Sequence, residues 1–291
     1  MTRVATAGPT TERLLERAGS VARRLLDHPL PWLAPTLLVL AVFQLYPMVE
    51  AVLMSFTNES LVRTESEFVG LAQYARLATD PQFREMLQVT GIYAFSSVVL
   101  HVLFGLVLAL AIDYGVRRGL RGHLTTRVSV LLAWIVPGII IGLVWKVMLV
   151  ENQFGAVNHF LGTLGIGPVP FRSDPTLALV STIVAGTWRG TAFSMIMFYG
   201  GLQRIPQRLY EAARVTTVLV TIYALNTFDL IFALTGGGPG RATQVLALFM
   251  YQEAFQDYAL GRGAAIAVVM LVTNLLLTGV YLSLFDVGDE L

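Results

Sequence analysis

Residues 200–214 read GGLQRIPQRLYEAAR and lie between two apolar stretches of the chain. One apolar stretch runs from Thr176 to Gly200, and the other runs from Thr216 to Thr235. A helix needs about 20 apolar residues to cross the hydrocarbon core of a bilayer, and each stretch meets that length. We therefore expect residues 203–214 to form a short basic turn between two membrane-spanning helices.

Composition extends this expectation to the whole chain. Hydrophobic residues make up 55% of the 291 residues and charged residues only 13%, whereas soluble domains carry about 25% charged residues. The apolar residues also form long runs, which is typical of transmembrane helices. We predict an all-α, polytopic membrane protein with about six spans, near residues 31–56, 86–112, 128–150, 176–200, 216–235 and 263–284.

The sequence divides into a polar segment of residues 1–28 and a transmembrane domain of residues 29–291. The first segment predicts a basic amphipathic helix on the cytoplasmic membrane surface, and a frayed polar tail is the alternative. Arginine collects in this segment and in residues 113–127 and 203–214. The positive-inside rule then places both termini in the cytoplasm.

Several function classes lack support in the sequence. The chain has no cysteine, so disulfides and thiolate metal sites are excluded. No catalytic or metal-spaced motif is present, and Gly236–Gly238 are not followed by the Gly-Lys-Ser/Thr of a phosphate-binding loop. No basic cluster with interleaved aromatic residues indicates nucleic-acid binding. We expect no enzymatic activity in this chain.

The run from Ile205 to Arg214 and the glycine-proline turn at Gly236–Gly240 carry a family resemblance. They resemble the membrane subunit of bacterial ATP-binding-cassette (ABC) importers, in particular the carbohydrate-uptake permeases related to the maltose and glycerol-phosphate systems, with the MetI-like fold. The resemblance implies that the Glu-Ala-Ala segment docks a cytosolic ATPase. The coupling residues would be Leu209, Tyr210, Glu211, Ala212, Ala213 and Arg214.

The resemblance also implies partners. These are a second homologous permease subunit, two ATP-binding subunits and an extracytoplasmic solute-binding protein, all in or at the lipid of the bacterial inner membrane. No cofactor is expected in this chain, because ATP and magnesium would be bound by the ATPase subunits.

Polar side chains within the spans indicate a transport path, because they are costly in lipid unless they face a cavity or a partner. Arg189, Asn226 and Asp229 are the central candidates, with aromatic side chains nearby that suit a sugar. Arg189 either contacts the ligand or pairs with Asp229. By resemblance, the path residues are Trp134, Gly138, Arg189, Gly190, Phe193, Asn226, Thr227 and Asp229.

The match breaks after Val215, where Thr216 and Thr217 stand in place of the family's Asp-Gly. The fifth span needs about 20 residues and therefore includes every residue from Thr216 to Thr235. No residues are left for the rest of a coupling helix. Two explanations are a truncated variant with impaired coupling and a stretch of the protein that is missing from this sequence.

Two other functions compete with an importer subunit. A self-sufficient secondary transporter or channel for a small polar solute would favour inverted repeats and discontinuous helices with ion ligands at mid-membrane. A membrane scaffold without a path would leave Arg189, Asn226 and Asp229 unexplained.

Overall fold

The computed structural model describes residues 29–63, 65–203 and 207–284, without the side chains of residues 29–31, 207–211, 282 and 284. Regular structure in these ranges is helical, apart from one isolated bridge between Thr57 and Phe68. The all-α prediction is therefore confirmed. The chain forms two compact units that divide between Leu53 and Met54. The amphipathic helix predicted within residues 1–28 lies outside the described residues.

The first unit holds one long apolar helical stretch. It consists of α2 (Pro29–Leu40), a π-helical turn (Ala41–Leu45) and α3 (Tyr46–Met54), which ends one residue into the second unit. A π-helical turn precedes Pro47, with the Tyr46 N–H donating to the Ala41 carbonyl. A wider turn suits a proline that has no N–H of its own to donate.

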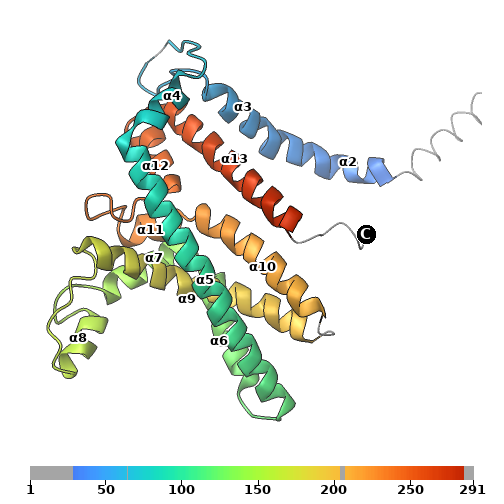
Figure 1. The fold of residues 1–291 in the computed structure, drawn as a ribbon, viewed down its shortest axis with the longest axis vertical. Coiled ribbons are helices and arrows are strands. Elements are labelled where there is room, and N and C mark those ends of the chain that lie inside the picture. Colours follow the sequence, from blue (N-terminus) through green and yellow to red (C-terminus); the bar gives the residue numbers. More distant parts are fainter. Residues whose placement is uncertain (1–28, 64, 204–206, 285–291) are drawn as a thin grey trace, which may run out of the picture. The chain divides into compact units, whose positions relative to one another are not determined.

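Four long helices frame the second unit: α5 (Pro81–Arg117), α9 (Pro175–Leu202), α10 (Gln207–Leu225) and α13 (Leu260–Leu284) (Figure 1). Two of them begin with the same signal. The side chains of Asp80 and Asp174 accept hydrogen bonds from the backbone N–H groups of Gln82 and Leu177, both at 2.8 Å, and a proline follows each cap. Both helices thus begin with an aspartate that caps the first free N–H groups, followed by a proline whose φ angle suits the first helical position.

Helices α5 and α9 pack closely because small residues lie between them. A side chain at Gly105 would overlap Ser194, and one at Gly186 would lie 2.6 Å from the Tyr93 hydroxyl. Close approach through small residues is typical of helix pairs in membranes. The pair forms the centre of the second unit, and the other helices pack around it.

The third predicted span, residues 128–150, is not one straight helix. It is broken into α6 (His123–Ile135) and α7 (Gly138–Met148), which are bent by 102°. Val136 is extended, with ψ of 129°, as expected for a residue before proline. Pro137 cannot continue the hydrogen-bond ladder of α6, so the chain changes direction there.

The fifth predicted span, residues 216–235, is also wrong in its limits. Helix α10 starts earlier, at Gln207, and ends at Leu225, and a short helix α11 (Asp229–Leu234) follows after a break. The basic turn predicted over residues 203–214 is correspondingly shorter. The Glu-Ala-Ala segment lies in the first turns of α10 and is continuous with the membrane helix.

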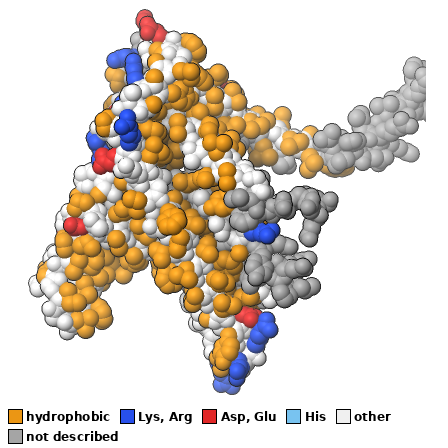
Figure 2. All heavy atoms as spheres, viewed as in Figure 1, with side chains coloured by type: hydrophobic (Ala, Val, Ile, Leu, Met, Phe, Trp, Pro, Cys, Tyr) orange, Lys and Arg blue, Asp and Glu red, His pale blue; other side chains and the backbone are white. Residues whose placement is uncertain are grey.

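Short helices fill the loops of the second unit: α4 (Ala72–Thr79), α8 (Ala156–Thr163), α12 (Leu246–Tyr251) and the π-helical turn η2 (Gln252–Gln256). Figure 2 shows hydrophobic side chains over most of the visible face, with charged side chains gathered near α4 and at the α5–α6 turn.

Within the described ranges, three helical stretches are long and apolar enough to cross a membrane, or four if the bent α6–α7 pair counts as one span. They are Trp32–Met54, Pro81–Arg117 and Leu260–Tyr281. Helix α9 is as long as a span but carries Arg189 and several threonines, and α10 starts with its polar Glu-Ala-Ala turns. These polar residues mark the helices that hold the candidate site.

Glycines in α5 provide a test of this packing. We expect Gly105→Ala to destabilise the protein by about 1–3 kcal/mol, because the added methyl group overlaps Ser194 on α9. A Cβ at Gly115, on the same helix, meets no atom within 4 Å. Gly115→Ala should therefore leave stability unchanged or raise it by up to about 1 kcal/mol. Thermal unfolding of the purified protein measures both, and equal effects would contradict the packing described.

Candidate functional site

Two helix breaks meet inside the second unit. The α6–α7 break places Gly138 at the start of α7, and the α10–α11 break places Asp229 at the start of α11. Helices α7 and α11 pack closely, since a Cβ at Gly142 would lie 2.6 Å from the Leu230 carbonyl oxygen. A Cβ at Gly138 would overlap both Asp229 and Arg189. These glycines allow the two breaks to approach each other.

Arg189, from the middle of α9, pairs with Asp229 at this meeting point. Its Nη1 lies 3.2 Å from Asp229 Oδ2 and 3.4 Å from Oδ1. The Arg189 side chain is 15% exposed and that of Asp229 42%. Asp229 Oδ1 also accepts from the Leu230 N–H at 2.8 Å, at the start of α11. The pair therefore neutralises Arg189 while one side of the carboxylate stays accessible.

One aromatic ring contacts the ion pair, and two others pack together on α6 and α9. The Arg189 guanidinium lies 5.4 Å from the centroid of the Tyr223 ring, a cation–π distance. Trp134, at the end of α6, packs against Phe193 with ring centroids 5.9 Å apart. The Trp134 side chain remains 47% exposed. The site thus combines one charge pair with accessible ring faces, as a largely apolar site with few polar groups requires.

Asn226 faces a different neighbour from Asp229. Its Nδ2 donates to the Ile222 carbonyl at 2.7 Å and to Asn274 Oδ1 of α13 at 3.3 Å, so the two amides join α10 and α13. Both amides line a cavity of about 410 Å³ together with Phe228, Tyr251 and Met270. The rings of Phe228 and Tyr251 lie 5.0 Å apart. The break between α10 and α11 therefore presents Asn226 and Asp229 to two separate surroundings.

Gly190 and Thr227 lie in contacts between helices. A Cβ at Gly190 would overlap the ring of His101 on α5. His101 is buried, and its Nε2 lies 3.1 Å from the Gly186 carbonyl oxygen, which favours a packing role. Thr227 is 5% exposed and donates to the Tyr223 carbonyl. Both predicted path residues therefore support the helices that carry Arg189 and Asn226.

The predicted coupling residues are described only in part. The side chains of Leu209, Tyr210 and Glu211 lie outside the described residues, although their backbone belongs to α10. Ala212 and Ala213 are half-buried, Ala213 packs against a cluster around Phe198, and Arg214 is exposed. The coupling role of this segment stays a prediction.

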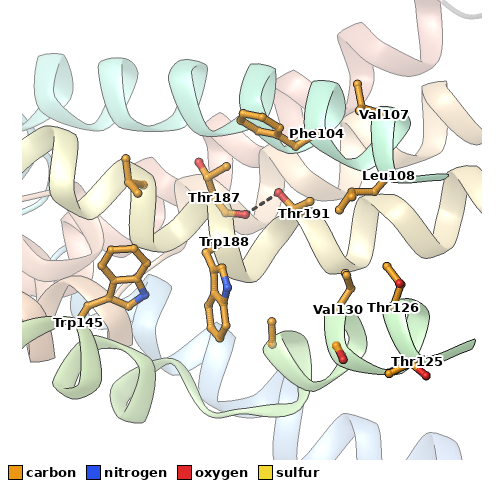
Figure 3. Close-up of a pocket in the computed structure, with 13 residues that line it drawn as sticks. Phe104, Val107, Leu108, Thr125, Thr126, Val130, Trp145, Thr187, Trp188 and Thr191 are labelled. Atoms are coloured by element: carbon orange, nitrogen blue, oxygen red, sulfur yellow. Dashed lines mark hydrogen bonds between the residues drawn. The ribbon is translucent and has the colours of Figure 1, made fainter. Parts of the chain in front are cut away.

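A separate groove of about 710 Å³ lies between α5, α6, α7 and α9 (Figure 3). Its walls are mainly apolar and include Phe104, Trp145 and Trp188. Thr187 and Thr191 also line it, with the Thr191 hydroxyl donating to the Thr187 carbonyl at 2.7 Å. Neither Arg189 nor Asp229 lines this groove, so it is distinct from the ion-pair site.

Sequence reasoning missed two members of the Asn226 cavity. Tyr251 lies in the loop helix α12, outside every predicted span, whereas Phe228 lies within the predicted fifth span, at the break between α10 and α11. The aromatic residues next to Asn226 were the available signal. In the described ranges, no group of three or more His, Asp or Glu side chains is placed to hold a metal ion.

The chain is similar over most of its length to transport permeases. It is 34% identical over 274 aligned residues to the "Trehalose/maltose transport system permease protein MalF" of Thermococcus litoralis, a match that covers 85% of this chain and 90% of that protein. It is 30% identical to the "Sulfoquinovosyl glycerol transport system permease protein SmoG" and 30% identical to the "sn-glycerol-3-phosphate transport system permease protein UgpA", both of Agrobacterium fabrum. These matches cover 88% and 86% of this chain, and 90% and 92% of those proteins.

The solved structures agree on the fold. A permease chain of a bacterial ABC transporter for the acidic polysaccharide alginate superposes with a TM-score of 0.68 at 20% identity, covering 95% of this chain and 99% of that chain. A second structure of an alginate ABC transporter, in complex with an alginate-bound periplasmic protein, gives a TM-score of 0.69 at 18% identity, covering 92% and 94%. No family model matches the chain.

The ion pair can be tested by a double-mutant cycle with Arg189→Met and Asp229→Leu. We expect the double variant to be more stable than the sum of the single effects predicts, by about 0.5–3 kcal/mol, because Asp229→Leu alone leaves a largely buried charge unpaired. The exposed Asp113–Arg117 pair within α5 is the control and should couple by less than about 0.5 kcal/mol. Thermal unfolding measures both cycles, and additive effects at Arg189 and Asp229 would refute the pairing.

Proposed function

This chain belongs to the family of membrane permeases of ABC importers for sugars and glycerol phosphate, and we propose that it forms half of the path for a sugar or sugar-like solute. Transport would proceed by alternating access, in which the two states differ in which side of the membrane the path faces. The meeting of the α6–α7 and α10–α11 breaks at the Arg189–Asp229 pair is the observation that carries this proposal.

The chemistry of this meeting point supports a polyhydroxylated solute. Broken helices are tolerated in a membrane where their free backbone groups line a cavity or are buried in protein. In this protein, polar side chains and the accessible rings of Trp134 and Tyr223 lie near the two breaks. Aromatic faces pack against the C–H surface of a sugar, and the Asp229 carboxylate accepts hydrogen bonds from its hydroxyls. The Asn226 amide offers hydrogen bonds from the separate cavity that it lines.

The nature of the solute depends on the ion pair. With Asp229 present, Arg189 is already neutralised, and this favours an uncharged sugar over an anion. The relatives are named for trehalose and maltose, sulfoquinovosyl glycerol and sn-glycerol 3-phosphate. A disaccharide of the trehalose or maltose type is the solute that this arrangement fits best.

We further propose the partners that such a permease requires. A second homologous permease would complete the path, two ATP-binding subunits would bind ATP and magnesium, and an extracytoplasmic protein would deliver the solute. The chain would lie in the bacterial inner membrane with both termini in the cytoplasm, because arginine collects in the loops on that side. It would carry no cofactor and no catalytic activity of its own.

Replacement of path residues should impair transport by the assembled complex. Asn226→Leu and Trp134→Ala should each lower solute-stimulated ATPase activity by about tenfold, since each removes a hydrogen bond or a ring contact worth roughly 1–1.5 kcal/mol. Gln88→Leu, at an exposed position of α5, is the matched control and should retain activity. Unchanged activity in both path variants would remove these residues from the site.

The coupling role of the Glu-Ala-Ala segment has its own test. Replacing Glu211 and Arg214 with alanine should lower the amount of ATPase subunit that co-purifies with this chain, because their charges would pair with groups on that subunit. Co-purification that is unaffected by both replacements would argue against docking at this segment.

A self-sufficient secondary transporter remains the second candidate. Its support is the presence of two discontinuous helices, a feature that such transporters share. The purified chain in liposomes distinguishes the two functions. Solute uptake by the chain alone, driven by an ion gradient and without ATP, would favour this candidate over an importer subunit.

A further inference from the structure

A small polar cavity of about 250 Å³ lies away from the ion pair, in the loop region between α11 and α13. Its walls come from three segments: Gln82 at the start of α5, the glycine turn Gly236–Gly240, and residues 241–257 around α12 and η2. Sites for drug-sized ligands measure roughly 300–1,000 Å³, so this cavity has room for a single sugar ring. None of Arg189, Asn226 or Asp229 lines it.

Amide side chains dominate the walls. Four glutamines from separate parts of the chain converge here: Gln82, Gln244, Gln252 and Gln256. An amide both donates and accepts hydrogen bonds, as does a hydroxyl group, so the two match without any change of protonation. Phe249 adds one aromatic surface to this amide cluster.

Gln244 has an unused acceptor in the cavity wall. The side chain is 7% exposed, and its Nε2 donates to Gln252 Oε1. Its Oε1 has no hydrogen-bond partner among the described residues. A buried acceptor without a partner is destabilising, and a ligand hydroxyl that donates to Oε1 would supply the missing hydrogen bond.

The walls are held in place without a ligand. The Thr243 hydroxyl donates to the Gly238 carbonyl at 2.9 Å, and the Thr243 N–H donates to the Gly237 carbonyl at 3.1 Å. On the other side, Arg262 forms ion pairs with Asp80 and with Glu253, and lies over the Phe249 ring. A preformed site spends little free energy on ordering when it binds.

The charges at the cavity favour a neutral ligand. Arg241 is the one cation among the lining residues; it faces the Gln82 amide and lies 4.0 Å from Glu85. Glu253 and Asp257 line the same cavity, and burial raises the pKa of Glu253, an effect that Arg262 opposes. With two acidic groups against one cation, a phosphate or sulfonate is disfavoured relative to an uncharged sugar.

We propose that this glutamine cavity is a second solute site that binds one ring of a neutral sugar outside the ion-pair site. The inference rests on the proposed function for its choice of ligand class. By the arginine distribution, the cavity lies on the side opposite the cytoplasmic loops, where an imported solute arrives. It therefore holds a sugar before that sugar reaches Arg189 and Asp229.

The absence of cysteine from this chain makes a protection experiment direct. Gln256 is exposed at the cavity, so Gln256→Cys introduces a single thiol there. The assembled complex in lipid nanodiscs is treated with a maleimide, and labelling of this chain is followed with trehalose, maltose or sn-glycerol 3-phosphate present. At about ten times its dissociation constant, trehalose or maltose should slow labelling about tenfold, and sn-glycerol 3-phosphate should not.

Additional variants identify the site that gives the protection. Adding Gln244→Leu to Gln256→Cys should abolish protection, and Gln82→Leu provides a second test if the first variant does not fold. Adding Gln88→Leu, outside the cavity, should retain protection. A cysteine at Phe154, which is 83% exposed and outside the cavity, should be labelled equally with and without sugar.

The outcomes separate this inference from the proposed function. Labelling does not require transport, so protection in a complex that carries Asn226→Leu would show the second site by itself. Transport of trehalose or maltose without protection at Gln256→Cys would overturn the second site and leave the proposed function standing. Protection that survives both Gln244→Leu and Gln82→Leu would also overturn it.

Discussion

A bilayer offers no water to a free backbone group or a charge, and the centre of this protein depends on how it meets that constraint. Two helices stop inside the second unit, at Pro137 and at Asn226, and each stop exposes polar groups. Arg189 of α9 approaches the second stop and is neutralised by Asp229. The glycines at 138 and 142 bring α7 against α11 next to this pair. The pairing of two interrupted helices with one charge pair gives the unit both its stability and its polar centre.

The sequence predicted the helical class and gave pairing with Asp229 as one of two roles for Arg189, because long apolar runs and isolated charges are strong signals in a membrane protein. It did not predict the geometry of the breaks. Pro137 and Gly138 indicated an interruption but not a bend of 102°. The break after Leu225 has no proline or glycine, and its Asn-Thr-Phe sequence gives no local signal. The glutamine cavity could not be predicted either, since Gln82 is far in sequence from the residues that it joins.

The Glu-Ala-Ala segment shows how a motif and its structure can differ. Counting about 20 residues for the fifth span placed the start of that span at Thr216 and left the motif in a turn. The structure begins α10 at Gln207 and ends it at Leu225, so the motif and the membrane part of the helix share one hydrogen-bond ladder. The two differ because the predicted span was counted back from Thr235, whereas α10 ends ten residues earlier, at Leu225.

The uninterrupted course of α10 has a mechanical consequence. From Arg214 to Asn226 the backbone rises about 18 Å, and no glycine or proline lies between them to act as a hinge. A force applied along the helix axis at Arg214 therefore moves Asn226 by about the same distance, because the helix between them is stiff. The chain can bend more easily only beyond Leu225, where α10 ends and three non-helical residues precede α11.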